Sequence, residues 1–344
     1  MQQRVRISPS VVASLDAARA LAAIYVVLHH VTGARGWHVG IGRVFVFGQE
    51  AVIAFFLLSG FVIFANERDR ALAPGGYYRR RIQRIYPALI AAMLVSTAVA
   101  WDKGDLAARF SVSELFGTLA GLQDNFFKPG TIVYPYLDND PLWSLSYELG
   151  FYLIFPLVLR AWHRYPRRTN HLVGAACCAA YVLYAVWPNH PALVAAYFML
   201  WWCGGMAADA YLRGGSSVRD FVTPVGWLVS LCGVMAAVVA IVGHRGFSFY
   251  PMLPLRHLGV GLSMVLLASS APGRAAARRC LPLARPAAWL ASISYGLYVL
   301  HYPVLVDWPR AWSIPGLIGG ALVLVALAWL SDHWLSRMMR QAWR

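Results

Sequence analysis

SLDAARALAAIYVVLHHV, residues 14–31, is apolar enough to cross a membrane, yet it carries several ionisable side chains. Arg19 and His30 are eleven residues apart in this stretch. Eleven steps of about 100° return to nearly the same helix face, and a rise of about 1.5 Å per residue separates the two groups by about 16 Å, roughly half of a hydrocarbon core. One helix stripe therefore holds a cation near one surface and an imidazole much deeper, which indicates a functional site. His29 points about 100° away from this stripe, so we favour His30.

The composition around this stretch is that of a membrane protein. The chain has 344 residues, of which 59% are hydrophobic and 13% charged, about half the charged fraction of a soluble domain. The apolar runs are continuous over about 20 residues and do not alternate as barrel strands do. We therefore predict an all-α fold, a polytopic membrane helical bundle, with residues 1–344 forming a single domain. The net charge of +15 does not indicate a nucleic-acid partner, because the basic residues lie in short loops between the apolar runs.

The pattern predicts about ten transmembrane helices within a helical core of residues 10–335. The long apolar runs are 14–32, 49–65, 83–101, 142–160, 171–187, 192–212, 222–243, 252–270, 289–306 and 314–333. The longest connection, 102–141, includes a stretch at 112–122 that is too short to span and suits a re-entrant or interfacial helix. This connection could form part of an acceptor-binding cap, or it could be a solvated cover over the bundle.

Loop charge predicts the orientation of the bundle. If the N-terminus is inside, the cytoplasmic segments hold 21 of the Lys and Arg residues and the outer loops hold seven. This asymmetry predicts that the N-terminus and the C-terminus are both cytoplasmic. The five cysteines have no metal-ligand spacing, and we expect no metal and no disulfide framework.

This orientation sorts the polar groups of the apolar runs into two layers. The inner layer consists of Arg19, Arg81 and Arg84, and the outer layer of His30, Glu50, Trp143, Glu148, His257 and His301. Arginine clusters bind phosphates, and histidine with a carboxylate is suited to general base catalysis. Simpler interpretations remain for some residues. Arg81 and Arg84 could be membrane anchors, Glu50 could favour a helix N-terminus, and His301 could be a core histidine.

Five segments resemble the membrane-bound acyltransferase-3 family, in the order expected for it. They are LDAARALAAIYVVLHH (15–30), EAVIAFFLLSGFVI (50–63), RRRIQRIYP (79–87), PLWSLSYELGFYLIFP (141–156) and SISYGLYVLHYPV (292–304). The resemblance places the family's Arg-x10-His pair on Arg19 and His30, its Arg-x-x-Arg pair on Arg81 and Arg84, and its glutamate on Glu148. Many members carry an appended extracytoplasmic hydrolase-like domain. Nothing in this chain matches one, so we expect a stand-alone O-acyltransferase.

The resemblance implies transfer of an acyl group, acetyl by default, from acyl-CoA to a hydroxyl of a sugar, polysaccharide or lipid-linked glycan at the outer side of a bacterial inner membrane. We expect Arg19, Arg81 and Arg84 to bind the acyl-CoA donor. His30 would act as general base, with Glu148 or Glu50 as its partner. The acceptor would meet three further outer-layer residues, namely Trp143, His257 and His301. Direct transfer and an acyl-histidine intermediate both remain open.

A transporter or flippase without acyl-transfer chemistry is the alternative. About ten helices with a charged interior also suit that class. However, we find no inverted repeat and no paired broken helices in the sequence, and base-like groups are expected on one side only. These features favour the enzyme.

Overall fold

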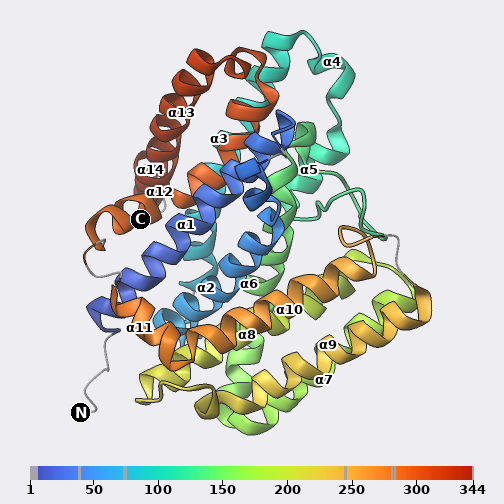
Figure 1. Ribbon diagram of the computed structural model, residues 1–344, viewed down its shortest axis with the longest axis vertical. Helices are drawn as coiled ribbons and strands as arrows, with labels where there is room; N and C mark the ends of the chain where they lie inside the picture. The colour runs from blue at the N-terminus through green and yellow to red at the C-terminus, as the bar shows by residue number, and fades with distance from the viewer. Residues whose placement is uncertain are drawn as a thin grey trace.

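The structure is a computed structural model, and it describes residues 7–37, 40–72, 76–243, 246–279, 282 and 284–342. Long helices pack side by side in one bundle (Figure 1). The principal helices are α1 (Pro9–Ala34), α2 (Gly48–Glu67), α3 (Tyr77–Lys103), α6 (Trp143–Arg164), α7 (Pro166–Val186), α8 (His190–Leu212), α9 (Val222–Val242), α10 (Met252–Ala268), α11 (Ala271–Arg279), α12 (Ala284–His301), α13 (Ile314–Trp329) and α14 (Ser336–Ala342). The charge and cysteine patterns also used Arg4, Arg6, Arg245, Cys280 and Arg344, which lie outside the described residues.

The predicted all-α membrane bundle is confirmed. Within the described residues, nine helices are long and apolar enough to cross a membrane, and ten if α10 and α11, bent by 77° at their junction, form one span. Each of the ten predicted apolar runs overlaps one of these helices. The cytoplasmic placement of the two termini stays a prediction.

The long connection between α3 and α6 is folded rather than extended. It contains α4 (Leu106–Arg109) and α5 (Val112–Ala120), followed by short 3₁₀ turns at Tyr136–Asp138 and Asp140–Leu142. The hydroxyl of Ser111 caps α5 by accepting a hydrogen bond from the backbone N–H of Glu114 at 3.3 Å. The predicted short helix at 112–122 is therefore present. Its position relative to the membrane stays a prediction.

The centre of the bundle is the contact between α2 and α8. α8 is largely buried, including Trp201 and Trp202, and its glycines allow the α2 backbone to approach closely. A Cβ added at Gly204 would lie 2.1 Å from the carbonyl oxygen of Leu57, and one added at Gly60 would lie 1.9 Å from that of Trp201. Small residues at such crossings let membrane helices pack backbone to backbone.

We expect Gly204→Leu to separate α2 from α8 and to lower the free energy of unfolding by about 1–3 kcal/mol, the usual cost of overpacking. Gly226→Leu on α9 is the matched control, because a Cβ there meets nothing within 4 Å. Thermal unfolding of both variants in detergent measures the difference. An unchanged midpoint for Gly204→Leu would contradict this packing.

Two helices change their winding at positions that matter for the site. α12 passes into a π-helical turn at Tyr302–Asp307, directly after His301, and α13 passes into another at Leu330–Leu335, which contains Asp332. Short π-helical segments are rare and occur frequently at functional sites.

Candidate active site

A cavity of about 700 Å³ lies inside the bundle, lined by α1, α2, α3, α6, α12 and the segment from Asp332 to Arg340. Along α12 its wall extends from Ala288 to Tyr298, ten residues or about 15 Å of helix. Five arginines line it, namely Arg19, Arg80, Arg81, Arg84 and Arg340. Ser144, at the start of α6, lies beside Tyr298 at the other end, where the two hydroxyls are 2.8 Å apart. The cavity thus extends from an arginine-rich end to the hydroxyls of Ser144 and Tyr298.

Buried carboxylates hold most of these arginines in place. Glu67, whose side chain is fully buried, pairs with Arg80 and with Arg81, the latter at 3.2 Å. Arg84 pairs with the buried Asp332 at 3.0 Å. Neither carboxylate was predicted from the sequence. Their signal was present, since each lies at the end of an apolar run, where an ionisable side chain needs a partner.

Arg19 differs from the α3 arginines. It lines the cavity, and among the described residues no carboxylate lies within ion-pair distance of its guanidinium. Asp16, one turn earlier, acts on it electrostatically but forms no ion pair. Arg19 therefore keeps its hydrogen-bonding capacity for a ligand, as a positively charged donor group at the cavity wall.

We expect Glu67→Gln to loosen the arginine-rich end and to lower the free energy of unfolding by about 1.5–3 kcal/mol, the cost of losing hydrogen bonds between charged groups. Asp69→Asn is the control, because its carboxylate is more than half exposed and, within the described ranges, pairs with Arg68 alone. Thermal unfolding compares the two variants. Equal midpoints would show that Glu67 does not organise the arginines.

A pair of histidines lies just beyond the cavity. The rings of His30 and His301 are 5.2 Å apart between centroids, although α1 and α12 are far apart in sequence. His301 is fully buried, and its Nδ1 donates a hydrogen bond to the carbonyl oxygen of Tyr298 at 2.7 Å. This bond leaves the lone pair of the neutral ring on Nε2, which has no partner in the described part of the chain. The ring of His29 also lies close to that of His30, at 4.9 Å between centroids, and its Nδ1 is 2.6 Å from the carbonyl oxygen of Phe45.

The two glutamates expected beside His30 have other neighbours. Glu148 accepts hydrogen bonds from Ser59 (3.1 Å) and from Tyr152 on the cavity wall. Glu50 is buried and pairs with Arg256. No contact among the described residues joins either carboxylate to His30. The structure therefore does not bring either carboxylate to His30, because a similar predicted depth does not set which way each helix turns its side chains.

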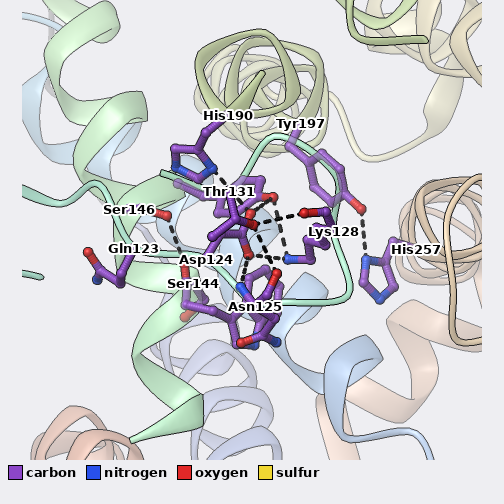
Figure 2. Close-up of polar contacts among 12 residues, drawn as sticks. Gln123, Asp124, Asn125, Lys128, Thr131, Ser144, Ser146, His190, Tyr197 and His257 are labelled. Carbon is purple, nitrogen blue, oxygen red and sulfur yellow. Dashed lines mark hydrogen bonds and ion pairs between the residues drawn. The ribbon is translucent and has the colours of Figure 1, made fainter. Parts of the chain in front are cut away.

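Trp143 and His257 are buried beside residues of the long connection between α3 and α6. Figure 2 shows His257 together with Asp124 and Lys128 of this connection. The Lys128 ammonium lies 3.5 Å from the centre of the Trp143 ring. The ring of His257 stacks on Trp143 at 6.4 Å, and its Nδ1 is 2.8 Å from the hydroxyl of Tyr197. Both side chains are buried, and Lys128 covers one face of Trp143. A role of Trp143 and His257 in acceptor binding stays a prediction.

Asp124 joins the parts of this network. Its carboxylate lies between Lys128 at 2.6 Å and His190 at 3.2 Å (Figure 2), and it accepts a hydrogen bond from Tyr147 at 2.6 Å. Burial alone would raise the pKa of Asp124, but the charge of Lys128 and the neighbouring ring of His190 outweigh it and hold this pKa below its usual range. These contacts hold the connection between α3 and α6 against α6 and α8. The four-residue spacing of Asp124 and Lys128 was a visible but weak signal for this pair.

The chain is similar to known acyltransferases over most of its length. It matches the acyltransferase-domain family over residues 12–334. It is 34% identical to the acyltransferase MdmB of Streptomyces mycarofaciens over 137 residues, which cover 39% of this chain and 34% of the relative. It is 24% identical to the peptidoglycan O-acetyltransferase OatA of Listeria monocytogenes over 338 residues, which cover 89% of this chain and 51% of the relative.

The matched region is only part of each relative. Nodulation protein 10 of Rhizobium leguminosarum is 30% identical over 149 residues, which cover 40% of each chain. The matched regions thus span from a third to a half of the length of these relatives. No solved structure matches the chain. The family match, which includes both Arg19 and His301, covers nearly the whole sequence, and the chain therefore belongs to the membrane-bound acyltransferase-3 family.

Proposed function

We propose that this protein is a membrane O-acyltransferase that moves an acyl group, acetyl by default, from acyl-CoA to a hydroxyl of a sugar or glycan. The observation that carries the proposal is the cavity between α1, α3, α6 and α12, which has arginines at one end and Tyr298, one turn before His301, at the other. The family match and the O-acetyltransferase among the relatives support the same reaction class.

In this proposal the acyl-CoA donor binds with its phosphates at the arginine-rich end of the cavity. The CoA phosphates meet Arg81, Arg84 and Arg19, and the pantetheine arm follows α12 toward Tyr298. Arg81 and Arg84 are held in position by Glu67 and Asp332, so they keep a fixed arrangement before the donor arrives. Preorganised arginines suit phosphate recognition because the guanidinium binds two oxygens at once.

The chemical step uses the histidine pair. The acceptor hydroxyl gives its proton to an imidazole nitrogen, for which His30 is our first candidate and the unpartnered Nε2 of His301 the second. The hydroxyl oxygen attacks the thioester carbonyl carbon, the carbon–sulfur bond breaks, and the CoA thiolate leaves and takes up the proton. The donor end faces the cytoplasm and the acceptor end faces outward, in the inner membrane of a bacterium.

Arg19→Gln tests the donor site. We expect it to raise the KM for acetyl-CoA about 10- to 100-fold, since a hydrogen bond to a charged group contributes about 1.5–3 kcal/mol. Free thiol release and labelling of a glycan acceptor by the purified protein are the measurements. Arg79→Gln is the control, because Arg79 is exposed and does not line the cavity. Carriage of a glycan across vesicles with no change in its mass would instead identify a transporter.

A further inference from the structure

A second cavity lies at the end of the bundle where α6 ends and α7 begins. Its volume is about 750 Å³, and it shares no lining residue with the candidate active site. The end of α6, the start of α7, the last turns of α8 and the start of α9 enclose it. Six arginines line it, namely Arg68, Arg164, Arg167, Arg168, Arg213 and Arg219. The proposed acyl transfer uses none of them.

The positive charge of this cavity is only partly neutralised. Asp209 pairs with Arg68 at 3.2 Å and with Arg213 at 2.8 Å. Asp220, the second carboxylate of the lining, accepts hydrogen bonds from the backbone N–H groups of Ser216 and Ser217 and caps the following turn. Across the described ranges, no carboxylate lies within ion-pair distance of the remaining four arginines. The cavity therefore keeps several guanidinium groups free for an anion.

Two of these arginines are held in place by an aromatic ring. Arg164 lies over the ring of Tyr165 at 5.3 Å and donates a hydrogen bond from Nε to its hydroxyl at 3.0 Å. Arg168 lies over the same ring at 5.5 Å. The 21-residue helix α7 begins at Pro166 without a side-chain cap, so its first N–H groups add a partial positive charge at the same place.

The surroundings of the cavity indicate which anion it takes. α7 and α9 pack against each other on one flank of the bundle (Figure 1), and both are candidate membrane spans with few buried residues. Val222 in the cavity wall is 61% exposed, and Leu172, further along α7, is 66% exposed. A phosphate in this cavity would thus lie beside apolar helix surfaces that suit acyl chains.

We propose that this cavity binds the phosphodiester headgroup of an anionic phospholipid, with the acyl chains lying along α7 and α9. Arg164, Arg168 and Arg219 contact the phosphate, and the N-terminus of α7 adds backbone donors. A soluble phosphate has the same anionic chemistry but gains nothing from the apolar flank. A basic helix end that only faces lipid headgroups in general would need neither a cavity formed by several helices nor four arginines without a carboxylate partner.

The test is a lipid titration of the full-length protein by native mass spectrometry, with phosphatidylglycerol and phosphatidylcholine. The variant carries Arg164→Gln, Arg168→Gln and Arg219→Gln. The control carries Arg278→Gln, Arg279→Gln and Arg285→Gln, three exposed arginines of equal charge outside the cavity. We expect the variant to bind phosphatidylglycerol about a hundredfold more weakly, since each arginine near an anionic lipid contributes about fivefold, and the control to bind it as the unaltered protein does.

The other outcomes overturn the proposal. Equal affinity of variant and control, or equal binding of phosphatidylcholine, would show that the cavity is not a site for anionic headgroups. Displacement of phosphatidylglycerol by inorganic phosphate at similar concentration would assign the cavity to a soluble phosphate instead. Thermal unfolding in detergent checks that the variant is folded. All of its altered side chains are exposed, so its midpoint is expected to match that of the control.

Discussion

His30→Gln is expected to lower the turnover number for acyl transfer by about 10²- to 10⁴-fold, the usual contribution of a positioned general base. The affinity for acyl-CoA is expected to change little, because His30 does not line the donor cavity. Glutamine keeps a polar side chain of similar size but accepts no proton near neutral pH. The measurement is the rate of acetyl transfer by purified, folded protein at saturating acetyl-CoA.

His29→Gln is the matched control, since it makes the same change at the neighbouring ring, 4.9 Å from that of His30, whose Nδ1 bonds to the carbonyl oxygen of Phe45. It is expected to retain most of the activity. A double variant with His30→Gln and His301→Gln tests whether the two histidines act together. If they do, it is no slower than the slower of the two single variants, as is usual for catalytic groups that depend on one another. Full activity of a folded His30→Gln protein would exclude His30 from the chemical step and leave His301 as the candidate.

Asp124→Asn is expected to lower the free energy of unfolding by about 3–5 kcal/mol, because it leaves the buried ammonium of Lys128 without its charged partner. Lys128 is 5% exposed and Asp124 is 1% exposed, so neither charge can turn toward water without opening the connection. The double variant Asp124→Asn with Lys128→Met removes both charges and is expected to recover at least half of the loss. Chemical unfolding in detergent, monitored by tryptophan fluorescence, measures the free energy of unfolding of the unaltered protein and of both variants.

The same pair predicts a dependence of stability on pH. The pKa of Asp124 is lower in the folded protein than its ordinary value, so its contribution is fully present above about pH 4 and is lost as the pH falls through the lowered pKa. The unaltered protein should therefore lose more stability on acidification than the double variant. Equal acid sensitivity of the two proteins would mean that this ion pair does not hold the connection between α3 and α6 in place.

The connection between α3 and α6 lies next to the candidate active-site cavity, so its stability can affect the proposed reaction. Lys128 covers one face of Trp143, and Trp143 lies next to Ser144, which lines the end of the active-site cavity. If the Asp124–Lys128 pair separated, the face of Trp143 that Lys128 covers would become exposed. An acceptor could bind at Trp143 only with this face exposed. Activity of the double variant at several acceptor concentrations would show whether the covered state limits the reaction.

The sequence by itself determined the class of this protein, its membrane-spanning helices and the stripe on α1. These features are local. A run of about 20 apolar residues satisfies its own backbone in a membrane, and a period of about 3.6 residues sets which side chains share a face. α1 is one unbroken helix from Pro9 to Ala34, so the predicted spacing of Arg19 and His30 holds.

Only the tertiary structure decided which charges meet. Depth along a helix can be counted from the sequence, whereas the rotation of each helix about its axis depends on how its neighbours pack. Glu148 and Glu50 were assigned a depth near His30, but packing turned one toward Ser59 in the cavity and the other toward Arg256. The same packing brought His301 to His30, from the opposite end of the chain. The partners of a buried charge are set by contacts between helices distant in sequence, which no local pattern records.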